Sequence, residues 1–204
     1  MSKVDYKKEL KELYSCKQEP VLVNVPSLQY LSVEGKGDPN TSKEYQNAIE
    51  ALFPVAFKIK FISKKELNKD YVVLPLEGMW WTEDMSKFSV DNKNDWLWNS
   101  LIMQPAHIDE EMLEKAKIEV TKKKELASLD KVKLISIEEG LSAQIMHIGP
   151  YSDEAPTIAK LHGFIEKQGY SFDGLRQKHH EIYLSDMRKT SPEKLRTIVR
   201  QPVG

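Results

Sequence analysis

Two segments decide how this chain folds: residues 28–35, LQYLSVEG, and residues 141–149, LSAQIMHIG. Each is an apolar, β-prone run that ends at a glycine, where the chain can turn before its next element. A helical pattern follows each segment, and then come two strand-like runs that end in the same dipeptide, Gln104-Pro105 or Gln201-Pro202. The order strand, helix, strand, strand therefore occurs twice.

This repeat predicts an α+β fold of two βαββ units related by a pseudo-twofold axis. We expect the helices on one face of the sheet and a central ligand cleft where the units meet. The first unit should span about 21–105 and the second about 132–203, with a bridging helix at about 109–126. An N-terminal helical extension, residues 1–20, should precede a single domain at 21–204.

The composition limits the possible partners. The 204 residues include 30 Lys and Arg against 31 Asp and Glu, a net charge of −1, whereas phosphate binding needs clustered, uncompensated basic residues. No nucleic-acid partner is expected. The single cysteine, Cys16, excludes an internal disulfide and multi-cysteine metal sites. Because the histidines also lack ligands at zinc spacing, we predict no metal and no cofactor.

The sequence also carries expectations about location. No run approaches the roughly 18 consecutive apolar residues that indicate a membrane-spanning helix. The N-terminal segment, residues 1–14, is rich in lysine and glutamate and lacks the apolar stretch of a signal peptide. A cytoplasmic protein without a membrane partner is therefore expected.

A carboxylate stands inside a strand-like run near the C-terminus. Residues 179–185 read HHEIYLS, and a lone carboxylate is costly to bury there unless it is paired. Glu181 therefore lies on an exposed face, pairs with a lysine, or occupies a cleft as a functional group. Strand alternation places His179, Glu181 and Tyr183 on one face, which makes Tyr183 a candidate to contact a ligand.

A second run, residues 71–81 or YVVLPLEGMWW, is the expected counterpart in the first unit. If it is one long strand, alternation places Tyr71, Glu77 and Trp81 together on the face toward the cleft. Tyr71 could then wall an aromatic ligand or donate a hydrogen bond to its carbonyl. A half-buried structural tyrosine is the alternative.

All four tryptophans lie between residues 80 and 98, on two strands expected to form one hairpin. Trp80 and Trp81 are adjacent and face opposite ways, so the four cannot all line one pocket. Core packing should account for at least one or two of them, and a site for flat aromatic molecules would use the others as walls. We expect Trp81 and Trp98 to contact a ligand, with Trp80 as a further candidate.

Several separated motifs resemble one known family, the GyrI-like small-molecule-binding proteins. They are Gly35-Lys36-Gly37-Asp38-Pro39-Asn40-Thr41-Ser42, Leu76-Glu77-Gly78-Met79-Trp80-Trp81, His180-Glu181-Ile182-Tyr183-Leu184-Ser185-Asp186 and Arg200-Gln201-Pro202-Val203. The resemblance covers nearly the whole chain and implies the duplicated βαββ fold, also called SOUL-like. Glu181 matches the central acidic residue of the family. The Gly-Asp-Pro-Asn and Trp-Trp signatures are similar to those of stand-alone members that hydrolyse cyclopropane-bearing, DNA-alkylating natural products.

The resemblance implies a bacterial detoxifying protein that binds planar, hydrophobic aromatic compounds and opens cyclopropanoid xenobiotics by hydrolysis. Glu181 would deprotonate the attacking water, and Tyr71 would be the second catalytic residue. The expected ligand contacts are Trp81, Trp80, Trp98, Tyr183, Tyr151, Glu77 and His147.

Other functions stay open at this point. The main alternative is a non-enzymatic module that binds or sequesters several drugs, with Glu181 as a counter-charge to cationic ligands. A gyrase-inhibitor-like interaction protein is another, although nothing in the sequence itself supports gyrase contact. An effector domain for a separate regulator is the third. Only about 20 residues precede the first strand, too few for a helix-turn-helix domain, so direct control of transcription is not expected.

Overall fold

The computed structural model describes residues 3–88 and 93–204, and within them eight strands form one antiparallel sheet. The strands are β1 (Val21–Val25), β2 (Leu28–Lys36), β3 (Glu77–Trp81), β4 (Leu97–Gln104), β5 (Lys133–Ile137), β6 (Gly140–Ile148), β7 (His179–Tyr183) and β8 (Arg196–Pro202). The α-helices are α1 (Tyr6–Glu9), α2 (Lys11–Tyr14), α3 (Lys43–Glu66), α4 (Glu110–Thr121) and α5 (Ala155–Lys167). Short 3₁₀ helices are η1 (Met85–Lys87), η2 (Leu129–Lys131), η3 (Tyr151–Asp153) and η4 (Pro192–Lys194).

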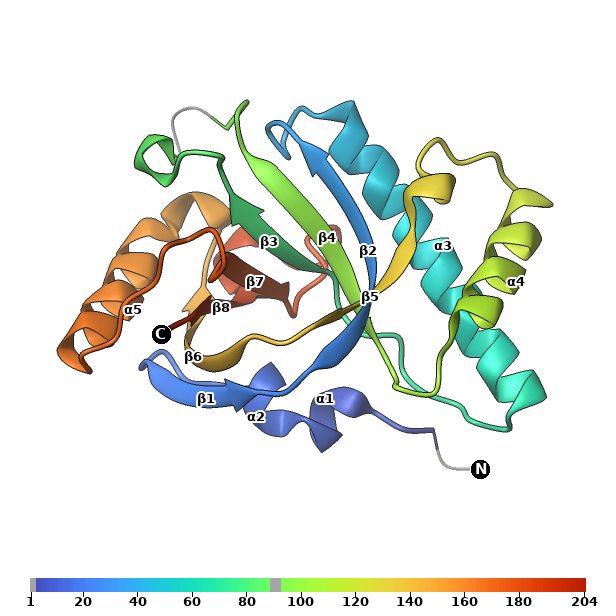
Figure 1. The fold of residues 1–204 in the computed structure, drawn as a ribbon, viewed down its shortest axis with the longest axis horizontal. Helices are drawn as coiled ribbons and strands as arrows, with labels where there is room; N and C mark the ends of the chain where they lie inside the picture. Colours follow the sequence, from blue (N-terminus) through green and yellow to red (C-terminus); the bar gives the residue numbers. More distant parts are fainter. Residues whose placement is uncertain (1–2, 89–92) are drawn as a thin grey trace.

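The sheet confirms the duplicated βαββ arrangement (Figure 1). Its strand order is β1-β6-β8-β7-β3-β4-β2-β5, so β2, β3 and β4 of one unit and β6, β7 and β8 of the other form two groups of three. The units meet where β3 pairs with β7. The outer strands are exchanged: β1, which precedes the first unit, pairs with β6 of the second, and β5 pairs with β2 of the first.

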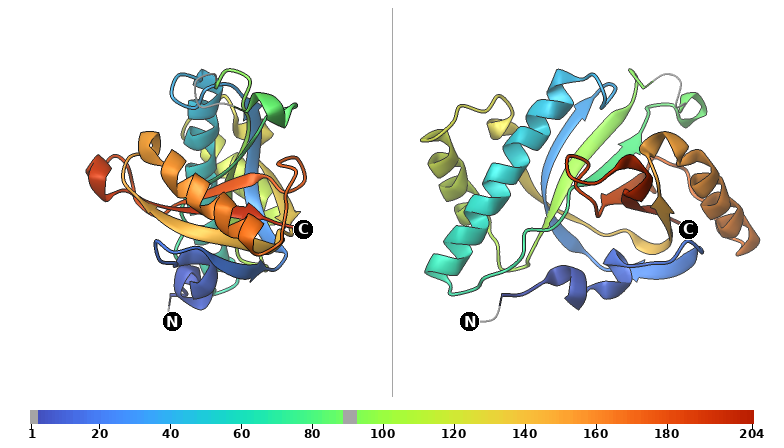
Figure 2. Two further views of the ribbon diagram at one scale, coloured as in Figure 1. Left: turned by 90° about the vertical axis from the view of Figure 1, so that its left-hand side faces the viewer. Right: turned by 180° about the vertical axis from the view of Figure 1, so that it is seen from behind.

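The long helices α3 and α5 cover the same face of the sheet. The core under α3 includes Leu31 of β2 and Trp98 of β4, and the core under α5 includes Ile145 of β6 and Val199 of β8. In the right panel of Figure 2, both helices lie toward the viewer and the hairpin of β7 and β8 lies between them. The junction of the two units is therefore flanked by a helix on either side.

The N-terminal extension covers the opposite face. It forms two short helices, and Leu13 and Tyr14 of α2 pack in a second core with Met146 and Ile198. The predicted bridging helix is α4, which Asp109 caps by accepting a hydrogen bond from Met112 N over 2.9 Å. Among the described residues, no helix has the length and apolar character needed to cross a membrane.

The long strand expected at 71–81 is wrong in its first half. Strand β3 begins only at Glu77, and Tyr71 makes a single isolated bridge to Val4. Pro75 supplies the reason, because it has no N–H to donate to a sheet ladder and so interrupts a central strand. The alternation counted back from Trp81 to Tyr71 therefore does not hold.

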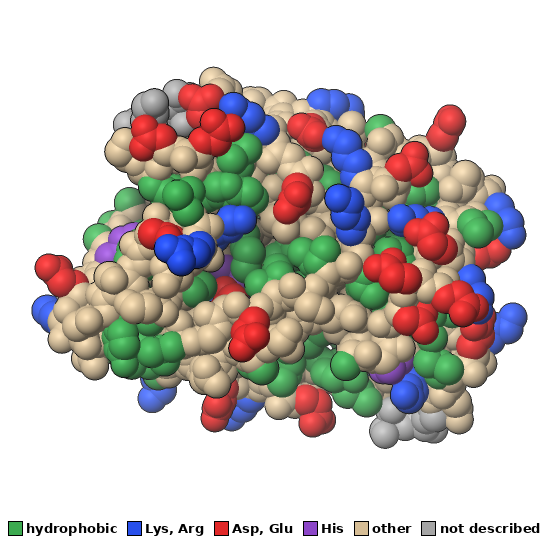
Figure 3. Space-filling model, viewed as in Figure 1, with side chains coloured by type: hydrophobic (Ala, Val, Ile, Leu, Met, Phe, Trp, Pro, Cys, Tyr) green, Lys and Arg blue, Asp and Glu red, His purple; other side chains and the backbone are tan. Residues whose placement is uncertain are grey.

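Charged side chains of both signs are intermixed over the face shown in Figure 3, most densely on the side of α3 and α4. On α4 itself, Lys115 pairs with Glu111 and Lys117 with Glu114, each over 2.9 Å. Exposed pairs of this kind contribute little to stability. These pairs lie on a solvated surface, and their balanced charges agree with the net charge of −1.

A close contact between β2 and β4 gives a first prediction, on stability. Gly35 lies directly opposite Trp98, and a Cβ added at Gly35 would overlap Cη2 and Cζ2 of the indole ring. Because Trp98 is fully buried, Gly35→Ala is expected to lower the free energy of unfolding by about 1–3 kcal/mol. Urea unfolding measures this change.

Gly163 of α5 supplies the control, since a Cβ added there meets nothing within 4 Å. Gly163→Ala should leave stability unchanged or raise it by up to about 1 kcal/mol, because alanine is the better helix former. Equal stability of Gly35→Ala and the wild type would contradict the contact.

Candidate functional site

Glu181 lies at the centre of the helix-covered face, where the two units meet. Its neighbours across the ladder are Gly78 of β3 and Val199 of β8. His179 Nε2 lies 3.0 Å from Glu181 Oε1, and the Tyr183 hydroxyl donates a hydrogen bond of 2.8 Å to Oε2. All three side chains of β7 therefore share one face, and both carboxylate oxygens have a partner.

Glu154 provides a second carboxyl group at the same place. It precedes the first turn of α5, yet its side chain makes no capping hydrogen bond. The residue is only 6% exposed, and Oε1 has no hydrogen-bond partner among the described residues. Burial, followed by the nearby charge of Glu181, raises the pKa of Glu154 to about 9.

The two carboxyl groups differ in protonation. Burial disfavours the charged form of Glu181, but hydrogen bonds from His179 and Tyr183 and the charge of Lys93 outweigh it and lower its pKa. Two close carboxylates in a desolvated site do not both ionise. At neutral pH, Glu181 is therefore a carboxylate and Glu154 a carboxylic acid.

Aromatic rings surround the Glu181 side of the pair. Trp80 Nε1 donates to the Tyr183 hydroxyl over 3.2 Å. The ring of Tyr151, from η3, meets the ring of Tyr183 edge-on with 5.6 Å between centroids. Tyr45 of α3 lies between two indoles, with its ring centroid 5.7 Å from that of Trp80 and 5.1 Å from that of Trp98.

The aromatic cluster continues toward the segment before β4. The ring of Trp96 lies 5.6 Å from that of Trp80, and Phe88 stacks on Trp96 with centroids 4.7 Å apart. Lys93 extends its ammonium over the Trp96 ring at 5.0 Å. The carboxyl pair thus has flat apolar walls on one side and a cation nearby.

The structure brings together Glu181, Trp80, Tyr183 and Tyr151 of the residues singled out from the sequence. Trp98 lies on the same face but is fully buried behind Tyr45. His147 also points to this face, opposite Thr197 of β8, where its ring contacts Thr157 Oγ1 at 3.0 Å and the Pro150 carbonyl at 3.1 Å. It supports the turn that carries Glu154.

Glu77 and Trp81 are not part of this group, which corrects their expected placement. The pairing of Gly78 with Glu181 and of Trp80 with His179 puts the even-numbered residues of β3 on the Glu181 face. Glu77 and Trp81 therefore point to the opposite face, where the ammonium of Lys178 covers the Trp81 ring at 3.7 Å. The register between the strands, which sequence does not show, decides this.

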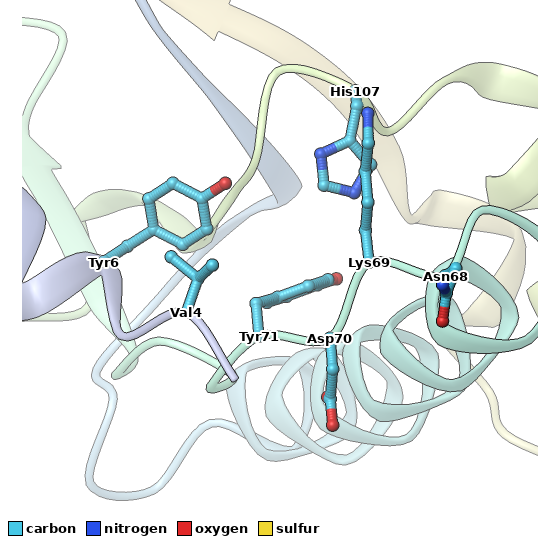
Figure 4. Close-up of a pocket in the computed structure, with 7 residues that line it drawn as sticks. All are labelled: Val4, Tyr6, Asn68, Lys69, Asp70, Tyr71 and His107. Atoms are coloured by element: carbon cyan, nitrogen blue, oxygen red, sulfur yellow. The ribbon is translucent and has the colours of Figure 1, made fainter. Parts of the chain in front are cut away.

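Tyr71 is also elsewhere. It lines a separate pocket of about 430 Å³ beside the N-terminal segment, with Tyr6 and His107 as neighbours (Figure 4). Its hydroxyl donates to Gln104 Oε1 over 3.1 Å. The tyrosine hydroxyl next to Glu181 is that of Tyr183.

A buried ion cluster occupies the other face of the sheet. His180, fully buried, places Nδ1 2.9 Å from Glu139 Oε1 and Nε2 3.0 Å from Glu77 Oε2. Arg200 Nη1 lies 3.0 Å from Glu139 Oε2, and Nη2 donates to the Leu13 carbonyl over 2.6 Å. This cluster of His180, Glu77, Glu139 and Arg200 fastens the N-terminal extension to the sheet.

Sequence reasoning missed Glu154 and Tyr45. An acidic residue just before a helix ordinarily indicates an N-cap, so Glu154 carries no distinguishing signal until its burial is known. Tyr45 falls on the apolar face of α3 and reads as core. Among the described residues, no group of three or more side chains could hold a metal ion.

Comparison with known proteins identifies a family. A model of the GyrI-like small molecule binding domain matches residues 18–203. An uncharacterized conserved protein from Listeria innocua is 44% identical, with a TM-score of 0.92 over 99% of this chain and 100% of its own. A hydrolase from Listeria innocua is also 44% identical, with a TM-score of 0.89 over the whole of both chains.

More distant structures share the fold alone. The C-terminal domain of EcmrR is 12% identical, with a TM-score of 0.57 over 91% of this chain and 97% of its own. The comparison with curated proteins found no match.

Proposed function

The chain belongs to the GyrI-like family of small-molecule-binding domains, and we propose that its ligands are planar, hydrophobic aromatic compounds bound at Glu181. We propose further that it hydrolyses cyclopropanoid electrophiles there. The observation that carries this proposal is the ionised Glu181, desolvated among aromatic side chains where the two units meet and held by His179 and Tyr183. The hydrolase from Listeria innocua, 44% identical over the whole chain, supports the choice of reaction.

The aromatic side chains suit a flat ligand. Trp80, Tyr45 and Tyr151 come from three different elements and present ring faces and edges around the carboxylate. Such rings bind planar compounds through large apolar contact areas and preferred stacking geometries. A ligand held there would have its reactive carbon close to the carboxylate.

Glu181 acts as the general base in this mechanism. It accepts a proton from water as the water oxygen bonds to the methylene carbon of the cyclopropane. The carbon–carbon bond of the strained ring breaks, and its electron pair passes through the conjugated system to the carbonyl oxygen. That oxygen becomes a phenolate, which a proton then neutralises, so the net change is the addition of one water.

The test uses a duocarmycin-like compound that contains the cyclopropane. Mass spectrometry should show a product heavier by one water, and Glu181→Gln should lower kcat by about 100-fold or more, since it removes the base. Glu166→Gln, at an exposed glutamate of α5, is the control and should retain wild-type turnover.

Binding without product would identify a different function. Fluorescence of Trp80 and its indole neighbours should be quenched when the compound binds, whether or not it reacts. Quenching with no product, equal in the wild type and Glu181→Gln, would indicate a drug-binding module and contradict the hydrolase.

A further inference from the structure

We propose that Glu154 is the proton donor of this reaction, so that Glu154 and Glu181 act as an acid–base pair. This inference rests on the proposed function, because the ring opening leaves an oxyanion that must be protonated. In a desolvated site, this proton has to come from a group held nearby. The geometry around Glu154 points to that group.

Glu154 is buried without a structural task. Buried polar atoms are nearly always hydrogen-bonded, and an exception calls for an explanation. Glu154 is 6% exposed and makes no cap to α5, and its Oε1 has no partner among the described residues. The hydroxyl of Thr197 on β8 lies beside Glu154 and acts on its pKa through a side-chain hydrogen bond. Glu154 Oε1 and this hydroxyl are therefore two buried polar groups, side by side on the helix-covered face, that can bind a ligand oxygen.

Burial, together with the charge of Glu181, keeps Glu154 protonated. From β7, Glu181 and the Tyr183 hydroxyl face it; from the segment before β4, Lys93; and from its own segment, Tyr151. Burial and the charge of Glu181 raise its pKa to about 9, and the opposing charge of Lys93 does not offset them. A protonated and an ionised carboxyl side by side is the usual way in which one site supplies both an acid and a base.

The other hydroxyls in the site are poor donors. Tyr183 already donates its proton to Glu181 and accepts from Trp80, and burial holds its pKa well above 10. Burial, with the charges of Glu154 and Glu181, raises the pKa of Tyr151 to about 12. His179 directs Nε2 at Glu181. Of Glu154, Tyr151 and Tyr183, Glu154 therefore holds the most acidic proton.

The proton balance closes within the pair. Before the reaction Glu154 holds one proton and Glu181 none. Water gives its proton to Glu181 while Glu154 gives its proton to the phenolate oxygen, so afterwards Glu181 holds one proton and Glu154 none. The pair therefore carries a single negative charge throughout, and transfer of a proton from Glu181 back to Glu154 restores the starting state.

The experiment compares Glu154→Gln with the wild type on the cyclopropane compound. We expect kcat to fall by about 100-fold, with little change in the affinity measured by fluorescence quenching. The wild-type rate should decline as pH rises through about 9, where Glu154 loses its proton, and this decline should be absent from the residual activity of the variant. Asp153→Asn, at the exposed neighbouring residue, should behave as the wild type.

Infrared difference spectroscopy gives a readout that does not depend on turnover. A protonated carboxyl band at neutral pH should be lost in Glu154→Gln and retained in Glu181→Gln. Absence of that band in the wild type, or wild-type kcat and pH profile in Glu154→Gln, would overturn the inference. No turnover by the wild type, with the band present, would instead sink the proposed reaction and leave a shared-proton carboxyl pair.

Discussion

Replacing Arg200 with methionine is expected to lower the free energy of unfolding by about 3–5 kcal/mol, because it removes one partner of a buried ion pair. Arg200 is 2% exposed and balances Glu139 in the buried ion cluster. Methionine fills a similar volume but leaves that carboxylate with the positive charge of His180 alone. Urea unfolding followed by circular dichroism measures the loss.

Arg196 is the matched control, since it lies on the same strand and face but is exposed. Arg196→Met should change stability by no more than about 0.5 kcal/mol. Adding Glu139→Gln to Arg200→Met should recover part of the loss, because it removes the uncompensated carboxylate. If the double variant is no more stable than Arg200→Met, the loss reflects packing and the charge explanation is wrong.

The stabilising effect of His180 is expected to decline by about 3 kcal/mol as the solution becomes alkaline. Each pKa unit by which folding raises the pKa of a group corresponds to about 1.4 kcal/mol of stability. Burial alone would lower the pKa of this imidazole, but the carboxylates of Glu139 and Glu77 outweigh it and raise the pKa from 6.5 to about 9. A group whose pKa is raised in the folded state contributes its full stability below pH 6.5 and loses it as the pH rises through 9.

The comparison with His180→Gln isolates this contribution, because Glu154, with its own raised pKa, also makes the wild type less stable as pH rises. The stability difference between wild type and variant should be largest near pH 6, shrink as the pH rises from 6.5 to about 9, and stay constant above that. NMR titration of the His180 ring should give the same raised pKa. A difference that stays constant across this range would show that the imidazole is not charged in the fold.

Glu139, in the same buried ion cluster, makes stability depend on pH in the opposite direction. Burial would raise the pKa of Glu139, but His180 and Arg200 outweigh it and hold the pKa at about 2, against 4.5 ordinarily. Its contribution is therefore present above pH 4.5 and lost as the pH falls through 2.

Much of the fold could be predicted because the order strand, helix, strand, strand occurs twice in the sequence. The turn glycines and the two Gln-Pro ends mark equivalent points of the units, and strand alternation correctly groups His179, Glu181 and Tyr183. Local periodicity carries this information, since it depends only on neighbours along the chain. Pairing between distant strands has no such local signal, so the exchange of β1 and β5 could not be predicted.

For the residues of the site, too, local sequence patterns could be predicted and the pairing of distant strands could not. Glu181 was detectable as a carboxylate within an apolar strand. Trp80 and Trp81 could not be separated, because a shift of one residue in the register of β3 would exchange their faces. Pro75 was a readable signal that Tyr71 lies outside the strand. Glu154 resembles a helix cap, and only its burial shows otherwise.

The exchanged outer strands also affect the order in which the molecule can assemble. During synthesis β1 emerges early, but its partner β6 follows only after the whole first unit. Val21 of β1 therefore cannot pair with Gln144 of β6 until that unit has been synthesised. In the meantime β2 lacks β5 along its outer edge. Pairing over such sequence distances is slow, and a ribosome-bound first half has an unfinished sheet. Because β3 pairs with β7 of the second unit, the surroundings of Glu181 cannot be complete until most of the chain has been synthesised.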